Sequence, residues 1–177
     1  IWLGFGDNHF TVNSTHAGTT VLNTAQGEDT VEINDVSGQV TVNTEQGDDI
    51  VNVRATSLNS DLFINTHEDI DTINLSDTSS ALPSAYPGSL PPPDADRIGV
   101  VDGIDGLVII DGGSEDDVVN VDDSRNAQDK LGTLTDSTLR GLSLPEGVNY
   151  SNLEDFNLWL GTGQDVLFID STHAGTT

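Results

Sequence analysis

The sequence predicts an all-β fold, a right-handed parallel β-solenoid with coils of about 20 to 22 residues. Short runs of alternating apolar and polar residues, typical of half-buried strands, recur along the chain. A turn with a glycine and an acid precedes one such run in each predicted coil, and no segment has the period of a long helix. The right hand follows from the general chirality of parallel crossovers and not from the spacing.

The first run of each predicted coil follows the pattern G-x-D-x-φ-x-φ, in which φ is apolar. Complete copies occupy residues 27–33, 47–53 and 163–169, and weaker copies at 6–12, 69–75 and 115–121 each replace one member. Stacking these runs in register gives two interior apolar columns. The first column contains Val31, Val51, Ile73, Val119 and Leu167, and the second contains Ile33, Val53, Leu75, Val121 and Ile169.

A second alternating run ends shortly before each acid of the turn. These runs contain Val40 and Val42, Leu62 and Ile64, and Val108 and Ile110. Residues 103–109 also fit the turn pattern, although they lie only 12 residues before the corresponding acid at Asp117. Two strand registers are therefore open between Asp102 and Gly113, one of which adds half a coil.

Two long gaps in the pattern predict insertions. The first, residues 78–97, contains five of the six prolines, which cannot donate to a β-ladder, and it predicts a loop that leaves the stack. The second, residues 122–155, contains six leucines and predicts a segment that covers an edge or flank of the solenoid. Four of the five basic residues lie in these insertions, so we expect the basic segment to fold back onto acidic coils.

The two ends of the sequence repeat one another. Residues 1–20 and 158–177 match at 11 of 20 positions, including an unbroken STHAGTT. We therefore expect residues 1–177 to be a single elongated solenoid fragment, made of one 157-residue tandem unit and the start of the next.

Composition excludes several classes of function. The chain carries 30 acidic and five basic residues, a formal net charge of -25, so it has no basic face for nucleic acid. No apolar stretch is long enough for a membrane span. Because the chain has no cysteine, its stability must come from packing, backbone ladders or cations bound to oxygen.

The recurring acids raise the question of how their charges are neutralised. Equivalent residues of stacked coils lie about 4.8 Å apart, and two like charges at about 5 Å repel by roughly 0.8 kcal/mol in water and about 3 kcal/mol at an effective dielectric of 20. Carboxylates and turn carbonyls are the hard oxygen ligands that Ca²⁺ prefers. The candidate calcium ligands are Asp29, Asp49, Asp71, Asp117 and Asp165, together with Asp105, Asp48 and Asp116.

The strings QGEDTVEI, QGDDIVNV, GGSEDDVVNV and GTGQDVLFI resemble the calcium-binding repeats of RTX proteins, which wind into a parallel β-roll. The resemblance implies an extracellular or cell-surface protein with Ca²⁺ in its turns. The wider pattern is similar to tandem modules of giant surface proteins or adhesins, whose partners are neighbouring repeats and extracellular glycans or surfaces. The chain departs from the family in having one acid per 20 to 22 residues, which leaves calcium stoichiometry open.

A non-enzymatic structural or adhesive module is the function that we expect, because no motif for nucleophilic, zinc or phosphate chemistry is present. One alternative is a β-helix that binds or cleaves polysaccharide. In that case Trp2 and Trp159, at positions equivalent to Asn43, would point outward and stack on sugar or pack against an insertion. Another is a passive acidic spacer without metal, in which the acids cap turn amides and face water.

Overall fold

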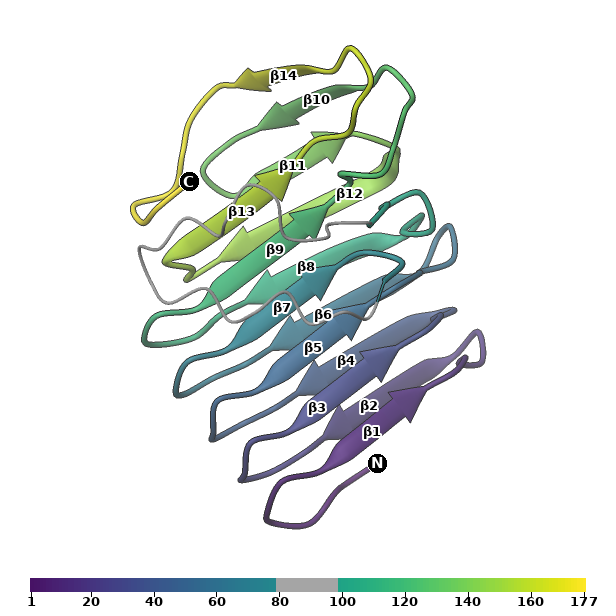
Figure 1. The fold of residues 1–177 in the computed structure, drawn as a ribbon. Helices are drawn as coiled ribbons and strands as arrows, with labels where there is room; N and C mark the ends of the chain where they lie inside the picture. The colour runs from purple at the N-terminus through teal and green to yellow at the C-terminus, as the bar shows by residue number, and fades with distance from the viewer. Residues whose placement is uncertain (79–98) are drawn as a thin grey trace.

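The computed structural model describes residues 1–78 and 99–177, and these residues form two β-sheets without any helix. The sheets lie face to face, and over most of the chain successive strands alternate between them (Figure 1). The all-β prediction is confirmed, and the pairing is mostly parallel. Over residues 9–75, parallel pairing joins residues that are 20 to 22 positions apart, such as Thr30 with Ile50 and Ile50 with Thr72.

The six-stranded sheet is parallel throughout. Its strands, in spatial order, are β1 (His9–Val12), β3 (Thr30–Ile33), β5 (Ile50–Val53), β7 (Thr72–Leu75), β9 (Val118–Asp122) and β13 (Asp155–Trp159). Strand alternation turns one set of side chains toward the other sheet. The inward side chains of β3, β5, β7 and β9 are buried valine, isoleucine and leucine residues.

The eight-stranded sheet is mixed. Its order is β14 (Val166–Ile169), β10 (Leu131–Leu134), β11 (Thr138–Gly141), β12 (Leu144–Ser151), β8 (Leu107–Asp111), β6 (Asp61–Asn65), β4 (Gln39–Asn43) and β2 (Thr19–Asn23). The two pairs that involve β11 with β10 and β12 are antiparallel, and the others are parallel.

The predicted core columns are correct for four coils and wrong at the fifth. Val31, Val51, Ile73 and Val119 pair in succession, as do Ile33, Val53, Leu75 and Val121. Phe156 and Leu158 of β13 then continue these columns. Leu167 and Ile169 instead lie in β14 of the other sheet, opposite Gly132 and Leu134.

Residues 122–155 explain the displaced fifth coil. They supply three strands, β10 to β12, and β12 pairs with β8 at the regular position in the eight-stranded sheet. Of the two predicted places, an edge or a flank, the segment takes the edge: β12 pairs along β8, and the three strands extend the stack from there. Because β13 follows β12 directly, Phe156 fills the core position before the predicted strand at 163–169 is reached.

The ambiguous register between residues 102 and 113 is resolved by β8. Val108 and Ile110 pair with Leu62 and Ile64, as the second-run pattern predicts. The competing pattern at residues 103–109 does not form a separate half coil, since Ile104 instead makes an isolated bridge to Thr56 at the turn before β8.

The proline-rich insertion predicted at residues 78–97 lies outside the described residues from position 79 onward. On either side of it, the Asp77 N–H donates to the Val100 carbonyl, and the Val100 N–H donates to Asp77 Oδ1 at 2.9 Å. The two flanks of the insertion are thus tied together.

Candidate functional site

The recurring acids lie at the corner where the chain passes from the eight-stranded to the six-stranded sheet. Four corners have equivalent backbone, at residues 23–29, 43–49, 65–71 and 111–117. In each, the third and fifth residues have positive φ, as in Glu45 (78°) and Gly47 (123°). A side chain at Gly47 would collide with the Gly27 carbonyl, which explains the glycine of the pattern.

The last residue of each corner points into the stack and not toward solvent. Asp29, Asp49, Asp71 and Asp117, which we call the aspartate column, are at most 1% exposed. The Asp29 N–H donates to Asp49 Oδ1 at 2.7 Å, and the Asp49 N–H donates to Asp71 Oδ1 at 2.8 Å. The column thus caps amides of neighbouring coils, but the expectation that such capping acids face water is wrong.

The same hydrogen-bonding pattern runs through the whole column. The Asp71 N–H donates to Asp117 Oδ1 at 2.9 Å. At one end the Asn8 N–H donates to Asp29 Oδ1 at 2.7 Å, and at the other the Asp117 N–H donates to Glu154 Oε2 at 2.9 Å. Each carboxylate therefore joins two coils through an amide that a regular β-ladder would leave unpaired at this corner.

The second oxygen of each column aspartate has no hydrogen-bond partner. The Oδ2 atoms of Asp29, Asp49, Asp71 and Asp117 are all buried and lack a partner with hydrogen-bond geometry. Burial raises the pKa values of Asp49 and Asp71, and the Thr44 and Thr66 hydroxyls nevertheless lower them in part. An unpaired charged oxygen in a dry environment is costly, so the arrangement favours uptake of a positive charge.

Burial raises the pKa of three column members far above the ordinary aspartate value. It raises the pKa of Asp71 to about 8, although the hydrogen bond from the Asp49 amide opposes this and the neighbouring charges of Asp49 and Asp117 add to it. Burial likewise raises the pKa values of Asp49 and Asp117 to about 7. These three carboxyl groups are therefore partly protonated near neutral pH.

A threonine row packs behind the column and was not anticipated from the sequence. The Thr24 hydroxyl donates to the Thr44 carbonyl at 2.8 Å, and the Thr66 hydroxyl donates to the Gly112 carbonyl at 2.7 Å. Each threonine precedes its aspartate by five residues. The signal that could have revealed the row is therefore the spacing T-x₄-D, which recurs at residues 24–29, 44–49 and 66–71.

The remaining candidate ligands do not join this column. Asp48 and Asp116 are exposed on the outside of the corner, and Asp48 Oδ1 accepts the Ile70 N–H at 3.2 Å. Asp165 accepts the Lys130 N–H at 2.9 Å, beside β14. Asp105 lies at the opposite corner, where its N–H donates to the Thr56 carbonyl.

Nothing in residues 1–78 and 99–177 gathers three or more histidine, aspartate or glutamate side chains in a group that could hold a metal ion. The donor chemistry of the corner is nevertheless of the type that Ca²⁺ accepts, because carboxylate oxygens and turn carbonyls are hard ligands. The outward acids in neighbouring coils, such as Glu28 and Asp48, are the ones open to solvent.

A second charge cluster, in which Lys130 and Asp123 are buried and Asp102 is exposed, lies away from the corner. The Lys130 ammonium, 4% exposed, donates to Asp102 Oδ1 at 2.5 Å and lies 3.0 Å from Asp123 Oδ2. Asn126 Nδ2 donates to both oxygens of Asp102. Burial alone would raise the pKa of Asp102, but the hydrogen bond and charge of Lys130 hold it below its usual value. We call these four residues the Lys130 cluster.

Ion pairs also show that basic residues of the predicted insertion do contact acidic residues of the earlier coils. Arg125 pairs with Asp77 at 2.5 Å, and Lys130 pairs with Asp102. Arg140 instead donates to the Val148 carbonyl at 2.7 Å.

No protein-family model, curated protein or solved structure matches this chain. In the described part of the chain, no helix has the length and apolar character needed to cross a bilayer. The functional assignment therefore depends on the residues themselves.

The two tryptophans occupy different sheets. Trp2 bridges to Asn23, which pairs with Asn43, so it lies at the predicted outward position and is 78% exposed. Trp159 ends β13 and pairs with Asp122 in the six-stranded sheet. The predicted equivalence of Trp159 with Asn43 is therefore wrong.

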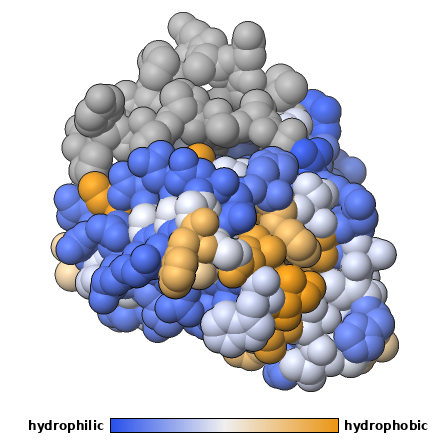
Figure 2. All heavy atoms as spheres, turned by 90° about the horizontal axis from the view of Figure 1, so that it is seen from below, coloured by the Kyte–Doolittle hydropathy of each residue, from blue (hydrophilic) through white to orange (hydrophobic). Residues whose placement is uncertain are grey.

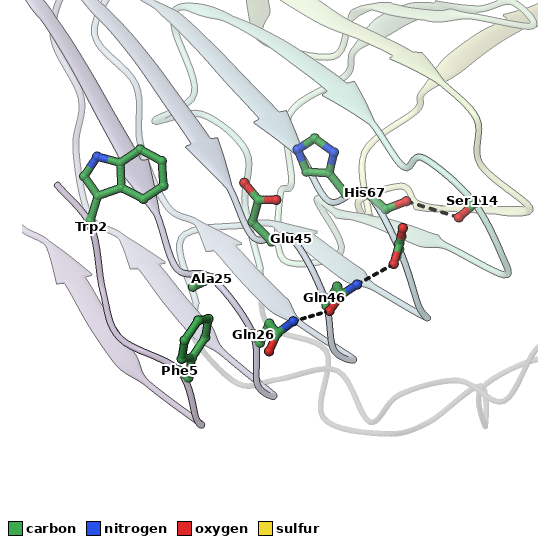
Figure 3. Close-up of a pocket in the computed structure, with 9 residues that line it drawn as sticks. Trp2, Phe5, Ala25, Gln26, Glu45, Gln46, His67 and Ser114 are labelled. Atoms are coloured by element: carbon green, nitrogen blue, oxygen red, sulfur yellow. Dashed lines mark hydrogen bonds between the residues drawn. The ribbon is translucent and has the colours of Figure 1, made fainter.

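An open groove follows the outside of the corner, with a volume of about 770 Å³. Trp2 and Phe5 lie at one end, and Gln26 and Gln46 follow from successive coils (Figure 3). Glu68 pairs with Gln46 and continues the lining in the next coil. The Gln26 amide donates to Gln46 Oε1 at 2.6 Å, and the Gln46 amide donates to Glu68 Oε2 at 2.8 Å. This surface combines exposed aromatic rings with an ordered row of polar side chains.

Proposed function

We propose that the chain is a non-enzymatic structural module of a larger extracellular or cell-surface protein, folded as a right-handed parallel solenoid with coils of 20 to 22 residues. The observation that carries the proposal is the continuous stacking of like side chains from coil to coil. In the six-stranded sheet, Asn74 donates to Asn52 at 2.8 Å and Asn120 donates to Asn74 at 2.9 Å. Such rows add stiffness along the stack without requiring any reactive group.

The other sheet supports the same role. Asn43 donates to Asn23 at 2.7 Å, and Asn65 donates to Asn43 at 2.8 Å. Together with the aspartate column, three polar rows run parallel to the stack axis. A tandem series of such modules would give a long, stiff spacer between a cell surface and its surroundings.

Calcium is the cation that we propose for the acidic corner. The net charge of -25 and the solvent-facing acids of successive coils support it. The ligands would be outward carboxylates such as Asp48 and Asp116 with nearby turn carbonyls, and bound calcium would lower the electrostatic repulsion between coils.

A metal-free spacer is the second candidate. It is favoured by the position of the aspartate column, whose Oδ1 atoms already accept amide hydrogen bonds between coils. In this case the acids serve as structural caps, and the outward carboxylates only keep the module soluble.

Thermal unfolding of calcium-stripped protein, with and without added Ca²⁺, separates the two candidates. The calcium proposal expects a rise of several degrees in Tm that is lost in an Asp48→Asn/Asp116→Asn variant and kept in the control Asp61→Asn. An unchanged Tm at millimolar calcium would reject calcium and leave the metal-free spacer. Rapid proteolysis of the folded chain throughout its coils would reject the stiff module itself.

A further inference from the structure

The groove outside the acidic corner repeats one chemical pattern over several coils. Gln26 and Gln46 bridge in parallel, as do Gln46 and Glu68, so these three side chains occupy equivalent positions. The Gly6 N–H donates to the Gln26 carbonyl just as the Gly27 N–H donates to that of Gln46, which makes Phe5 the equivalent of Gln26 one coil earlier. The groove is therefore a linear surface with one such side chain per coil.

Aromatic surface is concentrated at one end of this groove. Trp2 is 78% exposed and Phe5 is 83% exposed, although both belong to residue types that are usually buried in part. Figure 2 views the stack from below and shows hydrophobic residues gathered near the middle of that face, with hydrophilic residues around them. Flat, exposed rings of this kind bind the apolar face of a sugar ring by stacking.

The polar row retains hydrogen-bonding capacity beyond its own ladder. Each glutamine amide has two N–H donors and an oxygen with two lone pairs, and the ladder uses only part of this set. Glu45 and His67 stand beside the row and line the same groove (Figure 3). Side-chain amides and carboxylates in a row are suited to neighbouring hydroxyl groups of a polymer.

The spacing of these groups also fits a polymer. Neighbouring parallel strands lie about 4.8 Å apart, and each pyranose unit of a linear polysaccharide advances by a similar distance. A glycan lying along the stack would therefore present about one sugar to each coil over the few coils of the groove.

The negative charge of the groove lining limits which glycans could bind there. The lining contains two carboxylates, Glu45 and Glu68, and none of its residues is lysine or arginine. A polyuronate would be repelled by this surface, whereas a neutral chain or one that carries amines would not.

We propose that the groove binds a linear polysaccharide that is neutral or carries amino groups, with Trp2 and Phe5 stacking on sugar rings and the Gln26, Gln46, Glu68 row bonding their hydroxyls. The assignment rests on the proposed extracellular function, to which it adds a ligand. Trp2 is the stacking anchor, because its bridge to Asn23 fixes the backbone that carries it.

Isothermal titration calorimetry of residues 1–177 with cellohexaose, chitosan hexamer and polygalacturonate tests the proposal. Binding of one or both of the first two is expected, with Trp2→Ala weakening it at least about tenfold and Gln46→Ala several-fold. Trp2→Phe should retain part of the affinity. Phe168→Ala is the matched control, since Phe168 is 54% exposed but lies in β14, outside the groove.

Three outcomes would overturn the assignment. They are no heat of binding with either oligosaccharide at millimolar concentration, equal affinity of the parent chain and Trp2→Ala, and tighter binding of polygalacturonate. Tm is measured for every variant in the same preparations. A variant that loses glycan binding but keeps its Tm affects the glycan site alone and leaves the proposed structural module untouched. If Trp2→Ala also lowers the Tm, the affinities of Gln46→Ala and Trp2→Phe for the oligosaccharides decide whether the groove binds glycan.

Discussion

The aspartate column and the Lys130 cluster both bury carboxylates, but they differ in how the negative charge is met. Asp123 is 1% exposed and lies against the Lys130 ammonium. Asp71 is equally buried, and the ion pairs among the described residues all involve carboxylates outside its column. The Lys130 cluster contains a cationic side chain, whereas the ion pairs of the described residues provide none for the column.

This difference arises from the sequence positions of the two sites. The column recurs in four coils, and in three of them a lysine would have to enter a corner that is already filled by threonine and aspartate. The Lys130 cluster occurs once, where residues 122–155 depart from the repeat and bring a lysine beside Asp102. A repeated acid without a repeated base leaves buried carboxyl groups in the regular coils whose pKa values are raised toward neutral pH.

The largest effect on stability is expected when the Lys130 cluster loses its positive charge and, like the column, has a buried carboxylate without a cationic side chain. Lys130→Met should lower the free energy of unfolding by about 3 to 5 kcal/mol, because it leaves Asp123 buried without a counter-charge. Chemical denaturation at pH 7 measures this. The control Arg54→Met removes a more exposed pair with Glu32 and should cost less than about 1 kcal/mol. Similar losses in the two variants would contradict the distinction drawn here.

The next effect is expected when charge is removed from the column. Asp71→Asn keeps an oxygen that accepts the Asp49 N–H but cannot ionise, so at pH 8 it should stabilise the chain by about 1 to 3 kcal/mol. At pH 5 the gain should shrink, because Asp71 is then protonated in the folded protein. Asp61→Asn, on the exposed side of β6, serves as the control. Destabilisation of Asp71→Asn at pH 8 would show that the charged form is required.

The pH dependence of stability should have opposite signs at the two sites. The folded pKa values of about 7, 8 and 7 for Asp49, Asp71 and Asp117 lie above the ordinary value of 3.8. The folded state therefore holds protons more tightly, and the stability from these groups is lost as pH rises from the ordinary value of 3.8 to the folded values of about 7 to 8. Asp102 has a lowered pKa, so its contribution is lost as pH falls below its ordinary value.

Unfolding measured between pH 5 and 9 in a chelator should accordingly show a decline toward alkaline pH. Asp48, Glu115, Asp116 and Glu154 also act on the column and steepen this decline. The Asp71→Asn variant should decline less. A stability that rises steadily from pH 5 to 9 would rule out uncompensated burial of the column.

The smallest effect is expected in the threonine row that supports the column. Thr44→Val keeps the shape of the side chain but removes the hydroxyl that donates to the Thr66 carbonyl at 3.2 Å, and should cost about 1 kcal/mol. Thr41→Val on the outer face of β4 is the matched control and should change little. Equal effects at the two positions would argue against a role for the row.

Much of the fold follows from local pattern. The G-x-D-x-φ-x-φ copies at 27–33 and 47–53 combine a glycine required by positive φ with strict alternation, so both turn and strand are determined within seven residues. The copy at 163–169 has an equally good pattern but lies in the other sheet. Which sheet a strand joins depends on how many strands precede it, and this is not a local property.

The sequence identifies which aspartates form the candidate site, but it does not show that their side chains point into the stack. The recurrence of Asp29, Asp49 and Asp71 indicates a column, whereas their inward orientation depends on the two positive-φ residues before each of them. At the third coil that conformation is adopted by Asp69 instead of glycine, which the sequence gives no reason to expect. The Lys130 cluster joins residues 102, 123, 126 and 130 through tertiary packing, and no spacing rule identifies it.

Three successive strands, β10 to β12, lie in one sheet and interrupt the alternation between the two sheets. The segments that follow them therefore join a different sheet from the one that the sequence repeat predicts. The two copies of STHAGTT thereby come to occupy different surroundings. His16 and His173 each lie beside the threonine four residues later, Thr20 and Thr177, but His173 also contacts the Glu154 carbonyl and the Tyr150 ring. Identical letters will therefore give distinct histidine resonances in an NMR spectrum. An alignment by sequence alone would superpose Thr19, in β2 of the eight-stranded sheet, on Thr176, which bridges to Asp155 of the six-stranded sheet.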